Sequence, residues 1–474
     1  MSISSAFNVS RSGMTAAEAW ADLASANIAN ANRPGYAGRS ISFTTAGSAD
    51  GASVGATGVR RAVDEALVAK HRVELARVGT QEAKAAALEA YTTLLGAPGS
   101  SASPATTLAG LQNALDLLAN EPGNAGAQQG VVDAAVTMAR ALNDAGQGLE
   151  QTVADNEAGL QRDVQAVNDI IDRVAELNRM IRNQPEATSR RAALDDEVSV
   201  ALDDLAQLVD FRSVIGANGE ADLFTAKGTP LLQDGLAIGL TYDRSTGTLF
   251  AGGVDVTPGQ PGVRGFSEGA LAGRFELKQT VLPQMQRQLD EFARVLVAGS
   301  ESADGTLTPG QAGLFTDAQG AFAAAGLDGL AARIEVNDAV RTERGGDLWR
   351  IRDGIGAAAP GPESGQGQIG GLVALLSDAQ GFDPSAGLGA TQTLTDFAAA
   401  MVADQQQARV AASGRATALK AGAEAVEASR AGIEGVNIDD QLQQLMQIEQ
   451  AYAANSQVLR TLGDMLDTLL EIVR

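Results

Sequence analysis

Residues 438–473 read IDDQLQQLMQIEQAYAANSQVLRTLGDMLDTLLEIV, and large apolar side chains recur in this stretch with a period of seven. The first apolar heptad position holds Ile438, Leu445, Tyr452, Leu459, Leu466 and Val473. The second holds Gln441, Ile448, Asn455, Leu462 and Leu469. Nine of these eleven side chains are large and apolar. The pattern predicts one long helix with a coiled-coil seam.

A narrower stripe lies at the other end of the chain. One heptad position holds Phe7, Met14, Ala21 and Ile28, and the other holds Ser10, Ala17, Ala24 and Ala31. Small side chains suit close packing against a bulkier helix. Burying one large apolar side chain is worth roughly 1.5–3 kcal/mol, so we expect the terminal helices to pair with each other and with neighbouring copies. An ordinary terminal hairpin within one globular domain is the alternative.

The N-terminal helix is predicted to end at SANIANANRPGY, residues 25–36. The side chains of Asn27, Asn30 and Asn32 offer hydrogen bonds to nearby backbone, and Pro34-Gly35 stops the helix and turns the chain. An extended segment, Ser40–Thr44, follows. Nothing in this region is catalytic.

SANIANANRPGY resembles the N-terminal motif of bacterial flagellar axial proteins, the rod, hook and hook-associated family. GVNIDDQLQQLMQIEQAYAANSQVLRTLGDMLDTLL, residues 435–470, resembles the C-terminal motif of that family. Residues 125–183, 194–210 and 269–276 further resemble the members found at the hook–filament junction. Arg33 and residues 37–40 depart from the motif, and the region between residues 300 and 330 is short for the outer β-domain of some relatives.

The resemblance implies a structural, non-enzymatic protein that joins hook to filament by self-assembly through its terminal helices. It implies as partners further copies in a ring or helical layer, the hook protein, the second junction protein and an export chaperone on the C-terminal helix. It also implies an extracellular place in the flagellum, reached by type III export without a cleaved signal. The expected assembly residues are Phe7, Met14, Ala17, Ala24, Ile28, Asn30, Pro34, Gly35, Tyr36, Ile438, Leu445, Ile448, Tyr452, Leu459, Leu462, Leu466, Leu469 and Val473.

Composition narrows the functional classes. The chain has 474 residues, a net charge of −23 and no cysteine. The acidic balance argues against binding nucleic acid or an anionic membrane, because both attract Lys and Arg. Without cysteine there is no disulfide and no thiolate metal site. No apolar run reaches the roughly 18 residues that span a bilayer, and no cleavable signal is recognised, so residues alone favour the cytoplasm, against the resemblance.

The body between the termini is predicted to be helical with a strand-rich segment. Helices are expected at 63–95, 106–120, 125–183, 190–209, 271–298 (kinked or divided at Pro283) and 391–431, with β-hairpins around 216–219 and 242–247 and a short strand at 334–336. Residues 300–329 read as a small insertion or surface loop, and residues 357–371 as a linker.

The fold class is therefore mainly α with a smaller β part, in an elongated multidomain axial protein with a helical-bundle body. Residues 1–62 with 428–474 are expected to form a terminal coiled-coil assembly domain. Residues 63–300 with 334–427 form the helical body, with its β-rich segment at 211–265. Residues 301–333 are a small insertion, a reduced outer domain.

Motifs for catalysis or cofactors fail on their context. Gly365–Gly370 matches G-x-G-x-x-G but follows a Pro-rich segment instead of a strand. Two G-x-S-x-G matches, at 51–55 and 265–269, lack a suitably placed histidine, because His71 is the only one. His71 reads as a packed side chain. Asp195-Asp196-Glu197 and Asp203-Asp204 read as solvated faces, because adjacent helical residues diverge by about 100°. We expect no catalytic, metal or cofactor site.

Three alternatives stay open. The hook protein and the second junction protein share the terminal motifs and differ in location. A carboxylate-based hydrolase on an axial scaffold needs no sequence motif. A cytosolic coiled-coil scaffold would stay inside the cell.

Overall fold

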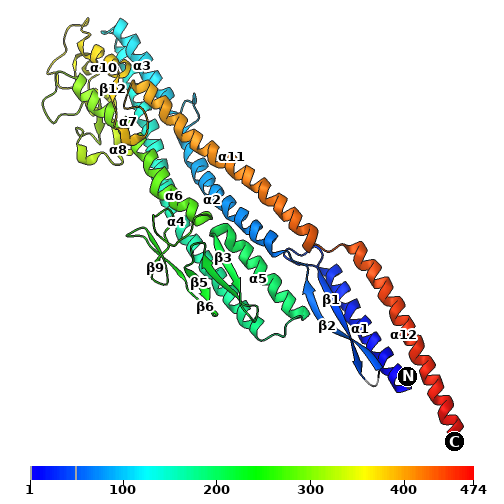
Figure 1. Cartoon of the computed structure of the whole chain (residues 1–474). Helices are drawn as coiled ribbons and strands as arrows, with labels where there is room; N and C mark the ends of the chain where they lie inside the picture. Colours follow the sequence, from blue (N-terminus) through cyan, green and yellow to red (C-terminus); the bar gives the residue numbers. More distant parts are fainter. Residues whose placement is uncertain (1–2, 49–50, 474) are drawn as a thin grey trace. The chain divides into compact units, whose positions relative to one another are not determined.

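The computed structural model of the protein describes residues 3–48 and 51–473. Helices make up 64% of the chain and strands 11%, so the mainly α class with a smaller β part is confirmed. Figure 1 colours the chain from blue at the N-terminus to red at the C-terminus. The helices longer than one turn are α1 (Ile3–Asn30), α2 (Glu65–Leu95), α3 (Pro104–Asn120), α4 (Ala125–Arg182), α5 (Ser189–Leu208), α6 (Ala270–Glu276), α7 (Leu282–Ala303), α10 (Gly367–Ser377), α11 (Leu394–Glu434) and α12 (Ile438–Val473).

The strands pair with antiparallel neighbours in small sheets. Two hairpins were predicted in the strand-rich segment, and both are confirmed as β3–β4 and β7–β8. The sheets are β1 (Arg39–Ser48) with β2 (Gly51–Arg61); β3 (Phe211–Ile215), β4 (Ala221–Thr225), β5 (Pro230–Gln233) and β6 (Leu236–Ala237); β7 (Leu240–Asp243), β8 (Thr248–Ala251) and β9 (Val254–Asp255); β10 (Phe315–Asp317) with β11 (Ile334–Val336); and β12 (Gln380–Gly381) with β13 (Thr391–Gln392).

The chain divides into two compact units. Unit 1 comprises Met1–Gly79, Asp163–Leu271 and Ala418–Arg474, and unit 2 comprises Thr80–Arg162 and Ala272–Thr417. Helices α2, α4 and α11 each supply residues to both units. The three-part domain division expected from the sequence remains a prediction.

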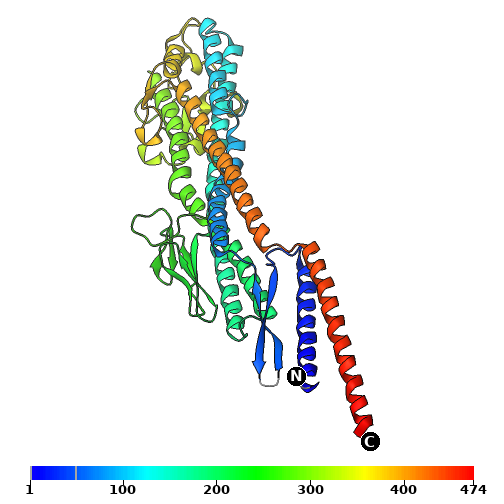
Figure 2. The same cartoon turned by 45° about the vertical axis from the view of Figure 1, so that its right-hand side comes forward.

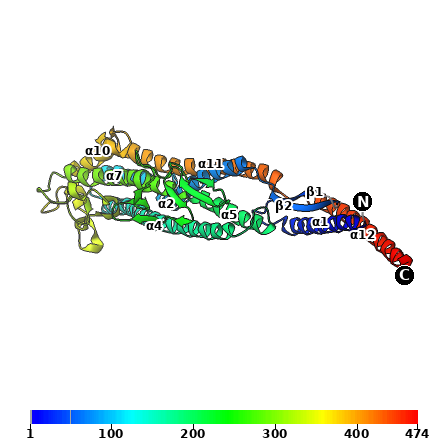
Figure 3. The ribbon, with the colours of Figure 1, turned by 60° about the horizontal axis from the view of Figure 1, so that its bottom comes forward.

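In unit 1, α1 and α12 lie side by side, and the β1–β2 hairpin lies along α1 (Figures 2 and 3). The N- and C-terminal helices therefore pair, as the two apolar stripes predict. Between β1 and β2 the register shifts once, between Ser42 and Phe43, where one extra residue is accommodated. The ring of Phe43 meets the ring of Trp20 edge-on, with 6.0 Å between their centroids, which fixes the hairpin against α1.

Two asparagines on α4 hold the two larger sheets of unit 1. The side chain of Asn178 donates to the carbonyl of Ala221 and accepts from its amide, both at 2.9 Å. Asn168 makes the same pair of bonds with Leu240, at 3.0 and 2.7 Å. Each side chain thus satisfies the backbone of the first residue of β4 or of β7, which a strand end would otherwise leave unpaired.

Unit 2 is built on one apolar core that joins α3, the first part of α4, α7, α10 and the first part of α11. The rings of Phe382 and Phe397 stack within it at 4.0 Å between centroids. Two one-turn helices, α8 (Leu330–Arg333) and α9 (Arg350–Asp353), also contribute buried residues to this core.

In unit 2, one helix, one loop and one linker differ in detail from what the sequence predicts. The helix expected at 271–298 is divided, as predicted, but the division is a π-helical turn at Leu277–Val281 that ends before Pro283, the expected position, and Pro283 lies in the first turn of α7. The loop expected at 300–329 is wrong in part, because β10 lies there and pairs with β11. The linker expected at 357–371 is wrong at its end, because α10 begins at Gly367 and buries Ile369.

Candidate functional site

The pairing of α1 with α12 rests on a small apolar cluster. Ala17, Ala24 and Ile448 are buried together, and Ile448 is only 3% exposed. The partly buried side chains of Trp20 and Leu445 pack around them. The two alanines let the backbones approach closely, so one isoleucine fills the space between them. The predicted packing of small side chains of α1 against large side chains of α12 is found in this part of the helix pair.

Polar contacts fix the direction of the pair. Asn27 Nδ2 donates to Gln441 Oε1 at 3.0 Å, and Ser456 Oγ donates to Met14 Sδ at 4.0 Å. Moving back along α1 therefore corresponds to moving forward along α12, and the helices are antiparallel. With equal rise per residue, Ile3 falls opposite about residue 467 of α12. The last residues of α12 extend beyond the start of α1.

The expected assembly residues divide by burial. Three are buried: Ala17, Ala24 and Ile448. Eight are partly buried: Met14, Ile28, Asn30, Gly35, Tyr36, Leu445, Leu459 and Leu462. Six are exposed: Phe7, Pro34, Ile438, Tyr452, Leu466 and Leu469. The side chain of Val473 lies outside those that the structure describes. Leu466 and Leu469 are 41% and 47% exposed, and Leu470 beside them is also exposed. Ile448 is therefore buried within the seam, whereas Ile438 and Tyr452 on either side of it are 41% and 38% exposed, and the end of the seam from Leu466 is open.

Asn27 is the polar centre of the terminal motif. It is 2% exposed, and its Oδ1 accepts from the hydroxyl of Tyr36 at 2.8 Å and from the amide of Arg39 at 3.1 Å. Its Nδ2 donates to the carbonyl of Arg39 at 2.9 Å, in addition to Gln441. One side chain thus ties α1 to its following turn, to the start of β1 and to α12. Asn30, the asparagine expected to act here, instead donates to Ala26 one turn back on its own helix.

The break between α11 and α12 is anchored on both sides. The amide of Gly38 donates to the carbonyl of Glu434 at 2.6 Å, which satisfies the last turn of α11. The side chain of Asn437 then caps α12 by accepting from the amide of Asp439 at 3.0 Å. The terminal helix therefore starts from a fixed point beside β1.

An acidic face of α5 receives the arginines of three other segments. Asp196 accepts from Arg39 Nη2 at 2.8 Å and from Arg61 Nε at 2.7 Å, so it binds the two paired ends of the β1–β2 hairpin. Asp196 is buried, and it carries both bonds on separate carboxylate oxygens. This contact holds the base of the hairpin on α5.

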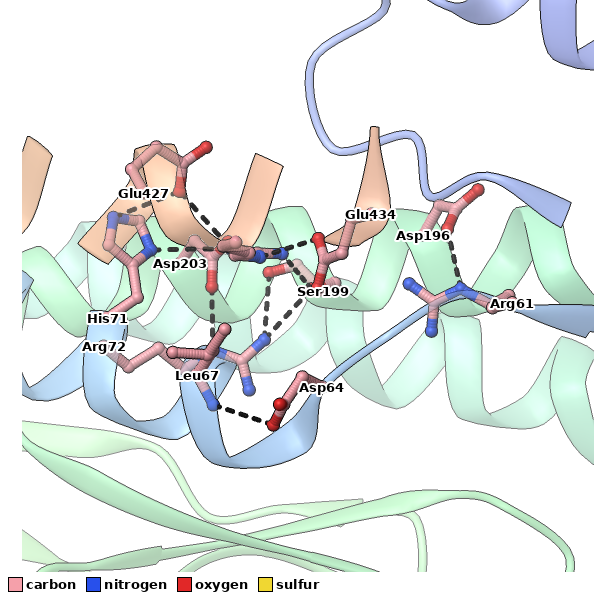
Figure 4. A network of polar contacts seen from close by, with 11 residues as sticks. Arg61, Asp64, Leu67, His71, Arg72, Asp196, Ser199, Asp203, Glu427 and Glu434 are labelled. Carbon is pink, nitrogen blue, oxygen red and sulfur yellow. Dashed lines mark hydrogen bonds and ion pairs between the residues drawn. The ribbon is translucent and has the colours of Figure 1, made fainter. Parts of the chain in front are cut away.

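Two turns further along α5, Asp203 and Ser199 bind a second arginine pair (Figure 4). Asp203 Oδ1 accepts from Arg72 Nε at 2.8 Å, and Oδ2 accepts from Arg430 Nη1 at 2.6 Å. Ser199 Oγ accepts from both arginines at 3.2 Å. Arg430 Nε also donates to Glu434 at 2.8 Å. Since Arg72 belongs to α2 and Arg430 to α11, the face joins three helices; we call Arg72, Ser199, Asp203, Arg430 and Glu434 the α5 clasp.

His71 lies at the edge of this clasp. Its Nδ1 lies 3.4 Å from Arg430 Nη1, and its Nε2 lies 3.4 Å from Glu427 Oε2. Burial lowers the pKa of His71 below its ordinary value, against the opposing effect of Glu427 and Asp203. The expectation that His71 is a packed side chain is correct, but its ring also makes polar contacts with Arg430 and Glu427.

The expectation that the α5 carboxylates are solvated is wrong for Asp196 and Asp203. Neighbouring residues do diverge around a helix, but residues seven apart return to the same face. Asp196 and Asp203 have this spacing, and Ser199 lies between them on the same side. The spacing was visible in the sequence, whereas the arginine partners, more than a hundred positions away in most cases, were not.

The described residues include no group of three or more His, Asp or Glu side chains placed to hold a metal ion. Among the same residues, no helix is long and apolar enough to cross a membrane. Between α2 and β3, a hollow of about 340 Å³ lies beside Val68, Val209 and Phe211. Its wall carries Asp210, which accepts from the amide of Ser267 at 2.8 Å, and burial raises the pKa of Asp210. This carboxylate supports a turn, and Glu65 and Glu268 also line the hollow.

Two stretches of the chain match known families of flagellar proteins. Residues 90–305 match the family described as the flagellar hook-associated protein FlgK helical domain. Residues 433–472 match the family described as the flagellar basal body rod FlgEFG protein C-terminal. These matches confirm the flagellar resemblance of the sequence, and the second covers nearly all of α12.

No curated protein matches the chain. One similar solved structure is that of the flagellar hook junction protein FlgK from Burkholderia pseudomallei, at 22% identity and a TM-score of 0.42. The match covers 52% of this chain and 46% of that one, so the chain spans less than half of that relative's length in the comparison.

Proposed function

We propose that this chain, whose residues 90–305 belong to the FlgK helical-domain family, is a structural subunit of the bacterial flagellum: hook-associated protein 1, which connects the hook to the filament. In this role it assembles through its terminal helices and catalyses no reaction. The family matches at both the helical body and the C-terminal helix support the proposal.

The observation that carries the proposal is the open end of the seam. Leu466, Leu469 and Leu470 are exposed in the single chain, on the part of α12 that lies opposite or beyond the first residues of α1. Because these leucines are already partly covered, full burial would add about half of the roughly 1.5–3 kcal/mol that burying a whole leucine side chain is worth. A neighbouring copy that supplies an apolar helix face would bury them, and repetition of a head-to-tail contact generates a ring or helical layer.

The same surface suggests the remaining partners. The hook protein would meet this layer on one side and the second junction protein on the other. Before assembly, an export chaperone would cover the exposed end of α12. The subunit would leave the cell by the flagellar type III route without a cleaved signal and reside in the extracellular flagellum.

The test places charge in the open seam. In a strain that lacks the native chain, the double variant L466D/L469D should leave hooks intact, abolish filaments and release filament protein into the medium. The matched control is L117D, because Leu117 on α3 is 61% exposed but lies outside the terminal helices. Full-length filaments on the double variant would overturn the proposal, as would equal loss with L117D.

Location separates the related alternatives. Immunogold labelling of the tagged chain should mark a thin layer at the hook tip. Label along the whole hook would favour the hook protein instead, and label retained in the cytosol would favour a coiled-coil scaffold. A truncation after Ala431 should abolish both junction assembly and chaperone binding, and hook–filament joining by that truncation would contradict the role of α12.

A further inference from the structure

His71 is the only histidine of the chain, and it lies on α2 facing α5 and α11. It is 8% exposed. Nothing in the proposed assembly uses it. Its two ring nitrogens nevertheless meet different charged groups on α11: Nδ1 faces Arg430, and Nε2 faces Glu427.

These neighbours define the protonation state of the ring. A guanidinium has only donors, so Nδ1 must be the nitrogen without hydrogen if it is to accept from Arg430. Nε2 then carries the hydrogen and directs it at the carboxylate of Glu427. The geometry therefore selects the neutral tautomer with hydrogen on Nε2.

A second proton can bind the His71 ring only at Nδ1, which lies 3.4 Å from Arg430 Nη1. Two cations, each with a hydrogen directed at the other, cannot keep that separation. Either the ring turns or the guanidinium withdraws, and the guanidinium is also the group that binds Asp203, Ser199 and Glu434.

The charged groups around the ring come from three helices. Arg72 on α2, Asp203 on α5, and Glu427, Arg430 and Glu434 on α11 make two positive and three negative charges. A proton on His71 would balance this count, so the net charge of the site does not exclude it. Protonation of His71 is opposed locally, by the positive charge of Arg430 at its contact with Nδ1. The side chain of Glu427 is 54% exposed, so solvent reaches this edge of the clasp.

We propose that His71 is a proton-sensitive catch: its neutral ring keeps Arg430 in the α5 clasp, and protonation of Nδ1 releases the end of α11 from α2 and α5. The end of α11 leads directly to the break before α12. Release would therefore free the fixed point from which the terminal helix starts, where Gly38 binds Glu434.

The direction of the pH effect follows from burial, which lowers the pKa of His71 in the folded chain from its ordinary 6.5. A lowered pKa means that the unfolded or opened segment binds the proton more tightly than the closed one. The contribution of neutral His71 to the stability of the closed segment is complete above pH 6.5. It is lost as the pH falls from 6.5 through the lowered pKa of the folded chain. One proton changes the opening equilibrium by at most about tenfold per pH unit.

A single histidine makes the first test direct. The full chain labelled with ¹⁵N-histidine gives one ring to observe by NMR. We expect the Nε2–H tautomer at pH 8 and a titration midpoint below 6.5. A ring with hydrogen on Nδ1, or a midpoint at or above 6.5, would overturn the proposal without any variant.

The second test links the proton to the helix. Hydrogen exchange of the amides in residues 418–434, corrected for the intrinsic pH dependence, should be faster at pH 5 than at pH 7, by at most about tenfold for each pH unit below 6.5. Amides of α3 in unit 2 serve as the control segment and should keep their corrected rates.

Two variants that do not titrate separate the contacts. In H71N the side-chain oxygen takes the place of Nδ1 as acceptor for Arg430, and in H71Q the side-chain nitrogen takes the place of Nε2 as donor to Glu427. We expect H71N to keep residues 418–434 protected at both pH values. The same acid response in H71N and H71Q as in the unmodified chain would show that another group carries it and would overturn the proposal. If either variant does not fold, the NMR titration decides alone.

Discussion

Asp203 accepts a hydrogen bond from Arg430 at 2.6 Å, although the two residues lie 227 positions apart in the sequence. The same carboxylate accepts from Arg72 through its other oxygen. A single acidic side chain on α5 therefore holds an arginine of α2 and an arginine of α11. The end of α11 is positioned by this contact, and three residues, 435–437, separate α11 from α12.

The first prediction concerns this carboxylate. D203N retains one acceptor oxygen but removes the charge, so one of two largely buried arginines loses its partner. We expect a loss of about 2–4 kcal/mol in the stability of unit 1, because an unpaired buried charge is costly. The loss of stability is measured by denaturant unfolding, with hydrogen exchange of the amides in residues 418–434 as the readout. D204N is the matched control: Asp204 is exposed, and the change there should stay within about 0.5 kcal/mol. Equal effects of the two variants would refute the clasp.

The second prediction compares two asparagines on α1. N27A leaves the Tyr36 hydroxyl, the backbone of Arg39 and the Gln441 side chain without their common partner. We expect a loss of about 2–3 kcal/mol and weaker exchange protection at the start of α12. N30A removes only a bond to the preceding turn of the same helix, and alanine favours the helix, so its effect should be below about 0.5 kcal/mol. The reverse order would restore Asn30 as the key residue of the motif.

The third prediction tests a buried hydrogen bond of unit 2. The hydroxyl of Tyr91 donates to Gln405 Oε1 at 2.5 Å, and Gln405 Nε2 donates to Gln288 Oε1 at 2.8 Å. Y91F leaves the Gln405 oxygen buried without its donor, which should cost about 1–3 kcal/mol. The thermal midpoint of unit 2 reports the loss. Y452F, at a tyrosine exposed on α12, is the control and should leave that midpoint unchanged.

The fourth prediction concerns helical glycines. A Cβ on Gly79 would lie 2.0 Å from the carbonyl oxygen of Gln207, so α2 and α5 approach each other across a position that only glycine allows. G79A should separate these helices and destabilise unit 1 by about 2 kcal/mol or more. Gly130 on α4 has open space where its Cβ would be. There, G130A should stabilise the helix by roughly 0.5–1 kcal/mol. Urea unfolding of both variants gives the two signs, and a stabilising G79A would contradict the close approach.

The sequence predicts the long helices well because their signals are local. The expected 125–183 and 190–209 correspond to Ala125–Arg182 and Ser189–Leu208. Apolar periodicity defines these helices, and Asn183 and Pro185 separate the first from the second. The hairpin between β3 and β4 is equally local, because its turn residues lie between the two strands.

The missed features depend on contacts between distant segments. The strand predicted at 334–336 is confirmed as β11, but its partner β10 has three residues, too few for an alternating pattern, and their pairing is set by tertiary packing. The Gly-rich composition of α10 concealed its helical spacing, Ile369, Leu372 and Leu376, all of which are buried. The local rule that places Asn30 among the expected assembly residues applies equally to Asn27, and only the position of Gln441 on α12 distinguishes the two.

The antiparallel contact between Asn27 and Gln441 spans 414 residues of the chain. A ribosome that adds about 5–20 residues per second needs roughly 20–80 s to cover that distance. During this interval Ala17 and Ala24 exist without Ile448, the side chain that buries them. Helix α1 is therefore completed only by residues that are synthesised about 414 positions later, and a nascent chain that has not yet reached Ile448 has no finished terminal pair.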